Sequence, residues 1–488
     1  MTTHRRQPID RLAQALIVLM AIIIIGMVVL GGPAAARVRD FSWQDRQIGA
    51  EDTAFLLTFS RPMDEASVEK NLTIDPPLPG RFSWAGRRMA YTLNFPAPYG
   101  NEFTVSLSDA RDRFSGAAAT FVPFETRFES RQRAFAYIGT DGEEQGRLML
   151  YNLSDQSKTA LTSEDWTVTD YEPYGQGDRI LFAAVDRNQR TLQNQQLYTV
   201  TTGLQREDSG QIETILESGE YQNLKFDLSP DGQTIVVQRV NRNNPGDFGP
   251  WVITADKVPR RLETEPGGDF IIAPDSQSLL LQQGEGTAII ALSDAQDEKS
   301  GDTLDFLPQY GLVMDVADNG SAAAMVSFNQ DDPEKRYTQT LFWVSNQGDE
   351  TPLIEVTGSI LDAQFDPTNE LLFCLTSQLV EGDTYQVQPS VSSINLTTEA
   401  IDELWKLPPQ PSAHMSLAPD GLALLLDEVV PGTDTDSSAV VEDGVAVSTA
   451  RIWLLPLYQT SDARLNKQPQ PAQPQVFPFS GLNPVWIP

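Results

Sequence analysis

A short turn that recurs along the chain constrains its fold more than any other feature. In the clearest copy a strand leads into Ser229-Pro230-Asp231-Gly232, and a more apolar strand leaves it. Proline presets the backbone angle at the first corner of such a turn, and glycine accepts positive φ without steric cost. The residues that define the repeated turn are Pro230, Asp231, Gly232, Pro274, Asp275, Pro367, Pro419, Asp420 and Gly421, and weaker copies occur at 174–178 and 316–320. Because the copies recur roughly every 45–65 residues, they predict stacked or radial modules.

Each repeat has the pattern of four strands, and seven repeats fill residues 134–488. The chain ends on Pro484–Pro488, which matches only the first half of a repeat, while the first repeat lacks the strand that precedes the turn. Pairing of the two ends would close a ring and remove its exposed sheet edges. The sequence therefore predicts an all-β chain whose 134–488 region is a roughly seven-bladed β-propeller closed by the C-terminal strand.

The first repeat also carries a family signature. The apolar strand Arg147–Leu153 is followed by a short polar turn and then by Lys158–Thr162. This pattern resembles the WD40-like propeller repeats of TolB-like periplasmic proteins, whose innermost strand ends in Trp-Ser-Pro-Asp-Gly, close to Ser229–Gly232 and Ala418–Gly421. The resemblance implies the fold only, because TolB joins its propeller to a different N-terminal domain.

Residues 37–128 have short alternating strands separated by proline and glycine, a pattern typical of a β-sandwich. The stretch Phe59–Asp64, with Pro62, Met63 and Asp64 at its end, resembles the bacterial Ig-like domain of surface-layer and envelope proteins. That resemblance implies a spacer or adhesion element. Residues 129–133 are predicted to link it to the propeller.

The N-terminus has the pattern of a membrane anchor. Arg5, Arg6 and Arg11 precede the uncharged, strongly apolar run Ala15–Leu30. Basic residues before an apolar run predict a cytoplasmic tail at 1–11, a single-pass signal-anchor helix at 12–36, and a periplasmic or otherwise extracytoplasmic location for the rest. Cleavage after about Ala36, as in a signal peptide, is the alternative.

Composition excludes several kinds of site. The net charge of −32 disfavours nucleic acid as a partner. The two histidines, His4 and His414, and the single cysteine, Cys374, cannot form a Cys/His zinc site. We interpret His414 as structural and Cys374 as a buried apolar residue. Two of the eight tryptophans, Trp43 and Trp84, belong to the sandwich region. The others, at most one in each repeat with Trp486 on the closing strand, are interpreted as packing residues of the blades in preference to a sugar-stacking platform.

Carboxylates are the remaining candidates for chemistry. Those predicted on inner strands or at their ends are Asp170, Asp227, Asp269, Asp315 and Asp366. A pair of them could hydrolyse or cleave a glycan, or each could accept backbone hydrogen bonds that hold neighbouring blades together. No cofactor is predicted. Calcium is the one metal considered, because Asn329–Glu334 and Asp434–Asp436 offer oxygen ligands, although neither has EF-hand spacing.

These features predict a non-enzymatic envelope protein. The Ig-like domain would act as a spacer, and the propeller would bind an unidentified envelope protein or polymer through its face and loops. The polar segments 429–449 and 461–475 are predicted to be mobile insertions. The alternative function is a propeller glycan hydrolase or lyase that uses a carboxylate pair.

Overall fold

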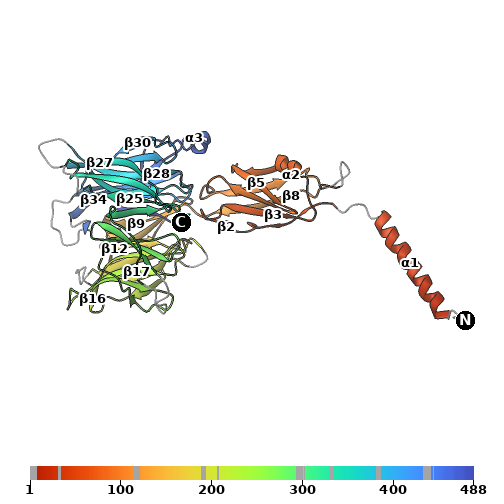
Figure 1. Cartoon of the computed structure of the whole chain (residues 1–488), viewed down its shortest axis with the longest axis horizontal. Helices are drawn as coiled ribbons and strands as arrows, with labels where there is room; N and C mark the ends of the chain where they lie inside the picture. Colours follow the sequence, from red (N-terminus) through yellow and green to blue (C-terminus); the bar gives the residue numbers. More distant parts are fainter. Residues whose placement is uncertain are drawn as a thin grey trace. The chain divides into compact units, whose positions relative to one another are not determined.

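The computed structural model describes residues 8–30, 35–114, 121–187, 194–205, 208–292, 301, 303–329, 334–380, 386–431, 441–442 and 445–488 (Figure 1). The chain is predominantly β and divides into two compact units. The first unit comprises Met1–Ile48, Asp52–Asn94 and Asn101–Ser130, and the second comprises Gly49–Glu51, Phe95–Gly100 and Arg131–Pro488.

The predicted membrane anchor is wrong. Helix α1 spans Pro8–Leu30, but within the described part of the chain no helix has the length and apolar character needed to cross a membrane. The strongly apolar run Ala15–Leu30 has sixteen residues, which rise only about 24 Å as a helix, against about 30 Å of bilayer hydrocarbon. The single-pass anchor at 12–36, and the localisation derived from it, are therefore corrected.

The first unit contains two four-stranded sheets. One has the order β1 (Val38–Phe41), β3 (Ala54–Phe59), β6 (Arg88–Leu93), β5 (Gly80–Ala85), and the other β2 (Gln47–Ile48), β8 (Phe124–Ser130), β7 (Glu102–Leu107), β4 (Leu72–Asp75). Buried Trp43 packs against both sheets, because its ring centroid lies 5.3 Å from that of Phe55 on β3 and 5.0 Å from that of Phe128 on β8. Two sheets that share an aromatic core form the layered arrangement of a sandwich.

The Pro62-Met63-Asp64 motif begins a short helix in this unit. Met63 is buried, and Asp64 caps the N-terminus of α2 (Glu65–Asn71) by accepting the Ser67 amide. A carboxylate at this position satisfies an amide that has no partner within the helix. The motif therefore fixes the connection between β3 and β4.

In the described part of the second unit, four antiparallel sheets have four strands each, one has seven strands because the long strand β27 (Glu350–Phe365) pairs with β26 and then with β28, and the last has five. Divided at β27, they form seven successive sheets, which agrees with the four strands predicted for each repeat. Sheet 1 has β36 (Gly481–Trp486), β9 (Ala134–Gly139), β10 (Leu148–Asn152) and β11 (Ser157–Ala160), and the 3₁₀ turn η2 (Gly142–Glu144) lies between β9 and β10. Sheet 2 has β12 (Trp166–Pro173), β13 (Arg179–Asp186), β14 (Gln196–Thr201) and β15 (Ile212–Leu216). Sheet 3 has β16 (Tyr221–Leu228), β17 (Ile235–Asn241), β18 (Phe248–Ile253) and β19 (Arg260–Arg261).

Sheets 4 to 7 follow the same order. Sheet 4 has β20 (Phe270–Ile272), β21 (Ser278–Gln283), β22 (Gly286–Ala291) and β23 (Thr303–Leu307). Sheet 5 has β24 (Leu312–Val316), β25 (Ala322–Ser327), β26 (Thr338–Ser345) and the first half of the long strand β27 (Glu350–Phe365). The second half of β27 begins sheet 6, with β28 (Leu371–Val380), β29 (Gln386–Asn395) and β30 (Ile401–Lys406). Sheet 7 has β31 (Met415–Leu417), β32 (Ala423–Pro431), β34 (Val445–Pro456) and β35 (Gln475–Val476), and β33 (Val441–Glu442) pairs with β34.

The C-terminal strand belongs to the first sheet. Strand β36 pairs antiparallel with β9, with Trp486 opposite Phe135, and the C-terminus lies beside β9 in Figure 1. We call β36, β12, β16, β20, β24, β27 and β31 the first strands of their sheets. The strand β36 contacts β31 of sheet 7 on one side and β12 of sheet 2 on the other. The half repeat at the end of the sequence therefore completes sheet 1.

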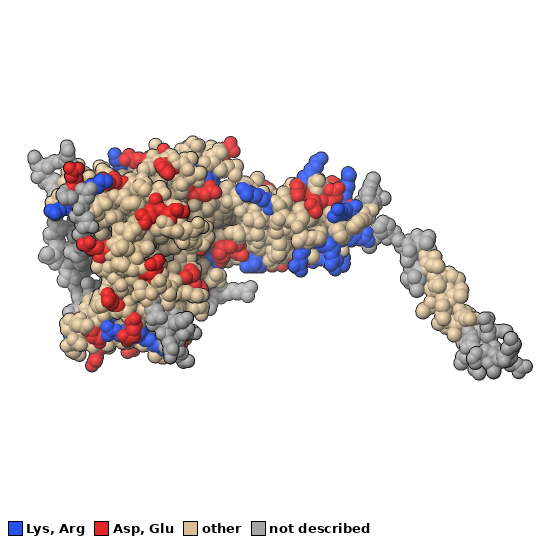
Figure 2. Space-filling model, viewed as in Figure 1, with Lys and Arg blue, Asp and Glu red and all other residues tan. Residues whose placement is uncertain are grey.

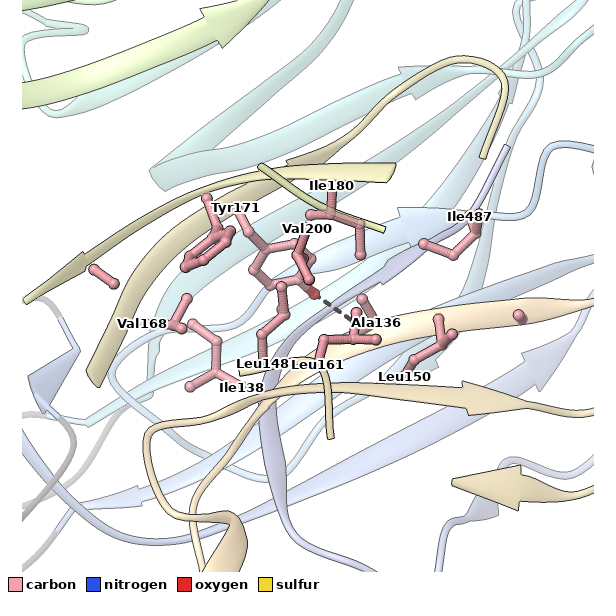
Figure 3. Packing of buried hydrophobic residues seen from close by; sticks show 13 residues of the cluster. Ala136, Ile138, Leu148, Leu150, Leu161, Val168, Tyr171, Ile180, Val200 and Ile487 are labelled. Atoms are coloured by element: carbon pink, nitrogen blue, oxygen red, sulfur yellow. Dashed lines mark hydrogen bonds between the residues drawn. The ribbon is translucent and has the colours of Figure 1, made fainter. Parts of the chain in front are cut away.

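Apolar side chains fill the spaces between neighbouring sheets. One cluster joins Ala136, Ile138 and Leu148 of sheet 1 to Val168 and Tyr171 of sheet 2 (Figure 3). The buried Tyr171 hydroxyl donates a hydrogen bond of 2.8 Å to the Ala136 carbonyl, so its polar atom is satisfied inside the core.

Tryptophan and cysteine take the packing roles that were predicted. Trp166 stacks on Tyr198 with 4.5 Å between ring centroids, and Trp405 meets Trp453 edge to face at 5.3 Å. Cys374 is fully buried, and burial raises the pKa of its thiol well above the ordinary value.

The segment 461–475 is ordered, which corrects the prediction of a mobile insertion. It begins with helix α3 (Ser461–Leu465), capped by Thr460. Farther along, the Gln470 amide donates to the Leu457 carbonyl at 2.8 Å and the Ala472 amide to Pro456 at 3.0 Å. These bonds attach the proline-rich stretch to the end of β34. The other predicted insertion, 429–449, falls largely outside the described residues.

Candidate functional site

The two ends of the seven sheets differ. In six of the seven sheets the first strand turns directly into the second through a connection of five or six residues, and we call this the turn end. The connections between third and fourth strands lie at the same end and have four to eighteen residues. At the opposite end, between second and third strands, the connections vary from two to thirteen residues, and we call this the loop end. Uniform turns are typical of structural repeats, and variable loops on a rigid scaffold are typical of binding sites.

The turn residues predicted from the sequence adopt the expected geometry. The fourth turn position has positive φ in Gly177, Gly232, Ser276, Gly320, Asn369 and Gly421. The turn aspartates accept amides of their own turns: Asp231 binds the Gln233 amide at 2.9 Å and Asp275 the Gln277 amide at 2.8 Å. Asp420 binds the Leu422 amide at 3.1 Å. These residues build the turns.

The penultimate residue of a first strand usually links its sheet to the next one. We call Glu172, Asp227, Asp315, Gln364 and Ser416 the linking residues. Each accepts the backbone N–H of the last residue in the neighbouring first strand: Leu228 to Glu172 (2.9 Å), Ile272 to Asp227 (2.5 Å), Phe365 to Asp315 (2.8 Å), Leu417 to Gln364 (2.8 Å) and Trp486 to Ser416 (3.1 Å). Five side chains thus perform the same structural task.

The two remaining junctions support this interpretation. Their penultimate residues are Ile271 and Val485, whose side chains have no acceptor. After Ile271, the Val316 amide is accepted by Asp315 of its own strand at 2.8 Å. After Val485, the corresponding position in β12 is Pro173, which has no N–H to satisfy. Acceptors therefore occur where a donor needs one.

Burial shifts the titration of the linking acids. It raises the pKa of Asp315 to about 7 and that of Asp227 to about 6. Burial, followed by the negative charge of Asp227, holds the pKa of Glu172 well above its usual range, and the two carboxyl groups hydrogen-bond to each other.

A second set of side chains lies two residues before each linking position. It consists of Asp170, Lys225, Asp269, Val313, Asp362, His414 and Asn483. We call this set the polar ring, because six of its seven members are polar and all seven are at least partly accessible. Its members influence one another across sheets: Lys225 and His414 oppose the burial that raises the pKa of Asp170.

Most members of the polar ring have specific partners. Lys225 forms an ion pair with Asp269, and Asp362 accepts a 2.7 Å hydrogen bond from Gln364. Burial nevertheless raises the pKa of Asp362 to about 6. His414 Nδ1 lies 2.9 Å from Oδ2 of fully buried Asp427, which also accepts the His414 amide. This geometry fits the predicted structural role of His414.

The five predicted acids take different positions in strands and turns, although Asp170, Asp227 and Asp269 all interact with Lys225. Asp227 and Asp315 are linking residues, Asp170 and Asp269 belong to the polar ring, and Asp366 accepts the Glu370 and Leu371 amides of its own turn at 2.8 and 2.7 Å. The sequence interpretation missed a further group of residues: Glu172, Lys225, Asp362 and Gln364. Each lies two or four residues before the first residue of a turn, and this constant spacing could have identified them from the sequence.

No metal site emerges among the described residues, where no group of three or more Asp, Glu, His or Cys side chains could hold an ion. Residues 330–333 of the first predicted calcium loop, and all of Asp434–Asp436, lie outside the described part of the chain. On the face shown in Figure 2, acidic side chains of the second unit are spread among uncharged ones. Charge alone therefore does not mark a site.

Comparison with protein-family models gives no match, and no curated protein matches the chain. Among solved structures, TolB from Acinetobacter baumannii is 9% identical, with 86% of this chain and 83% of that chain covered and a TM-score of 0.38. A proposed 6-phosphogluconolactonase from Bacteroides uniformis is 9% identical, with 73% and 100% covered and a TM-score of 0.43. An oligogalacturonate lyase in complex with manganese is 12% identical, with 58% and 79% covered and a TM-score of 0.41. The neighbours include TolB, which the repeats resemble, but at these scores no functional conclusion follows from them.

Proposed function

We propose that the second unit is a TolB-like, seven-bladed β-propeller closed by β36, and that it is a non-catalytic scaffold for binding a protein or a polymer. The first unit is then an Ig-like spacer. The linking residues carry this proposal: the acids that a sequence would nominate for catalysis, Asp227 and Asp315, are occupied by backbone amides of the next sheet. The succession of seven antiparallel sheets, obtained when the long strand β27 is divided between sheets 5 and 6, and the pairing of β36 with β9 support the closed ring.

The loop end is the proposed binding face. The connections between second and third strands at this end vary from two to thirteen residues, and side chains of the polar ring remain partly accessible. A rigid ring with variable loops can recognise a large partner without a group poised for proton transfer.

A carboxylate-based hydrolase or lyase is the second candidate function. It is favoured by one observation: Asp170 and Asp362 both have raised pKa values and both lie within the electrostatic influence of His414. Acids with perturbed pKa values next to a second titratable group are typical of active sites as well as of structural networks.

Site-specific photo-crosslinking distinguishes the two functions. A photoreactive residue replaces exposed Glu285 at the loop end, and in a matched control it replaces exposed Asn319 at the turn end. Scaffold binding predicts capture of a defined partner at position 285 and not at 319. Cleavage of a polysaccharide by the purified full chain, lost in both Asp170→Asn and Asp362→Asn, would instead establish the enzyme.

A further inference from the structure

The turn of sheet 2 departs from the pattern of the other turns. Its first position holds Tyr174, where the equivalent residues are small: Ser229, Ala273, Ala317, Asp366 and Ala418. Its second position holds Gly175, where four of the other five turns have proline: Pro230, Pro274, Pro367 and Pro419. Since those turns form without a tyrosine or a glycine at these positions, the turn itself does not require Tyr174 and Gly175.

A cavity of about 270 Å³ lies beside this unusual turn, between the turns of sheets 2 and 3. Its lining includes Tyr174, Gln176 and Arg179 from one turn and Asp231 and Gln233 from the other. A Cβ atom on Gly175 would lie 3.0 Å from the Pro230 carbonyl oxygen, and one on Gly232 would lie 3.0 Å from the Tyr174 ring. The glycines therefore allow the two turns to approach while leaving space beside them.

Contacts of Arg131 and Arg179 hold the lining residues in place. Arg131, whose side chain is only 10% exposed, donates to the Gly175 carbonyl at 3.0 Å and to Oε1 of Gln176 at 3.0 Å. The Arg179 guanidinium lies 5.4 Å from the Tyr174 ring centroid and its Nε is 3.0 Å from Asp178. Fixed side chains lose less conformational entropy when a ligand binds.

The chemistry of the lining is mixed. Arg179 can only donate hydrogen bonds, the carboxylates of Asp178 and Asp231 can only accept them, and the amides of Gln176 and Gln233 do both. Burial raises the pKa of Tyr174 to about 12, so its hydroxyl keeps its proton at neutral pH. An anion would meet two carboxylates here and a cation would meet the guanidinium, whereas a hydroxyl group can both donate and accept.

We propose that this cavity binds a neutral saccharide. The volume is slightly below the range of about 300–1,000 Å³ typical of drug-sized sites and suits one or two sugar rings. The cavity lies at the turn end, so the proposal is independent of whether the loop end binds a partner. For so small a ligand the expected Kd is on the order of 1 mM.

Titration of the purified full chain with maltohexaose, cellohexaose and chitohexaose, followed by saturation-transfer NMR, tests the proposal. Gly175→Pro restores the residue that equivalent turns carry and fills the cavity, and we expect it to weaken binding at least tenfold. The reciprocal change at the sheet 4 turn, Pro274→Gly, is the matched control and should leave binding unchanged.

Gln233→Ala, at an exposed lining position, is a second variant. Because this substitution does not restrict the backbone of the turn, the variant should fold like the wild type. We expect it to weaken binding several-fold while the melting temperature stays at the wild-type value. The proposal is overturned if none of the three sugars binds at a sugar concentration tenfold above the expected Kd. It is also overturned if both variants bind as the wild type does, or if only charged oligomers of galacturonic acid or glucosamine bind.

Discussion

At the scale of single residues, the acids near the first-strand ends are explained by the donors around them. Asp315 accepts two backbone amides, from Phe365 and from Val316, each at 2.8 Å. Two such bonds favour the carboxylate, yet burial dominates and raises the pKa of this group to about 7. Its protonation therefore changes close to neutral pH.

This shift predicts a pH dependence of stability. A carboxyl with a pKa of about 7 when folded and about 3.9 when unfolded binds more protons in the folded state between these values. Its contribution to stability is complete below pH 4 and is lost as the pH rises through 7. We measure the slope of unfolding free energy against pH by urea unfolding between pH 5 and 7. In Asp315→Asn we expect this slope to be less negative, by an amount that corresponds to at most about one bound proton. An unchanged slope would contradict the assignment.

At the scale of elements, the same turn residue has different consequences in different sheets. Asp275 is exposed and accepts the amides of Gln277 in its own turn and of Ser278 at the start of β21. Asp420 is 1% exposed, accepts the Tyr99 amide at 2.9 Å and forms an ion pair with Arg133. All of these residues belong to the second unit.

The contrast predicts unequal costs for one substitution. Asp420→Ala leaves the largely buried Arg133 without this partner and should reduce the free energy of unfolding by about 3 kcal/mol. Asp275→Ala removes exposed turn hydrogen bonds and should cost less than about 1.5 kcal/mol. Thermal unfolding of the two variants measures the difference, and equal losses would show that the burial of Asp420 is without consequence.

The elements differed in how far the sequence predicted them. The turns and the four strands of each repeat could be predicted, because proline, glycine and alternating apolar residues act locally. The links between sheets could not, since Glu172 and Leu228 are 56 residues apart and meet only in the folded chain. The membrane anchor was mispredicted because sixteen apolar residues give a strong signal yet fall short of a bilayer.

At the scale of the whole molecule, the linking residues connect one sheet of the second unit to the next. In the second unit, side chains near the ends of first strands connect successive sheets through hydrogen bonds, and β36 lies between β31 and β12. If these bonds hold the sheets together, the acids among them serve the fold, and the proposed binding sites are the loop end and the cavity at the turn end.

Hydrogen exchange followed by mass spectrometry tests this claim most directly. In Asp227→Ala, whose side chain no longer accepts the Ile272 amide, the peptide containing Ile272 should exchange at least tenfold faster than in the wild type. Asp315→Ala, which removes the linking acid of another junction, is the matched control and should leave that exchange within twofold of wild type. Equal exchange of the Ile272 peptide in wild type and Asp227→Ala would contradict the structural role of the acids among the linking residues.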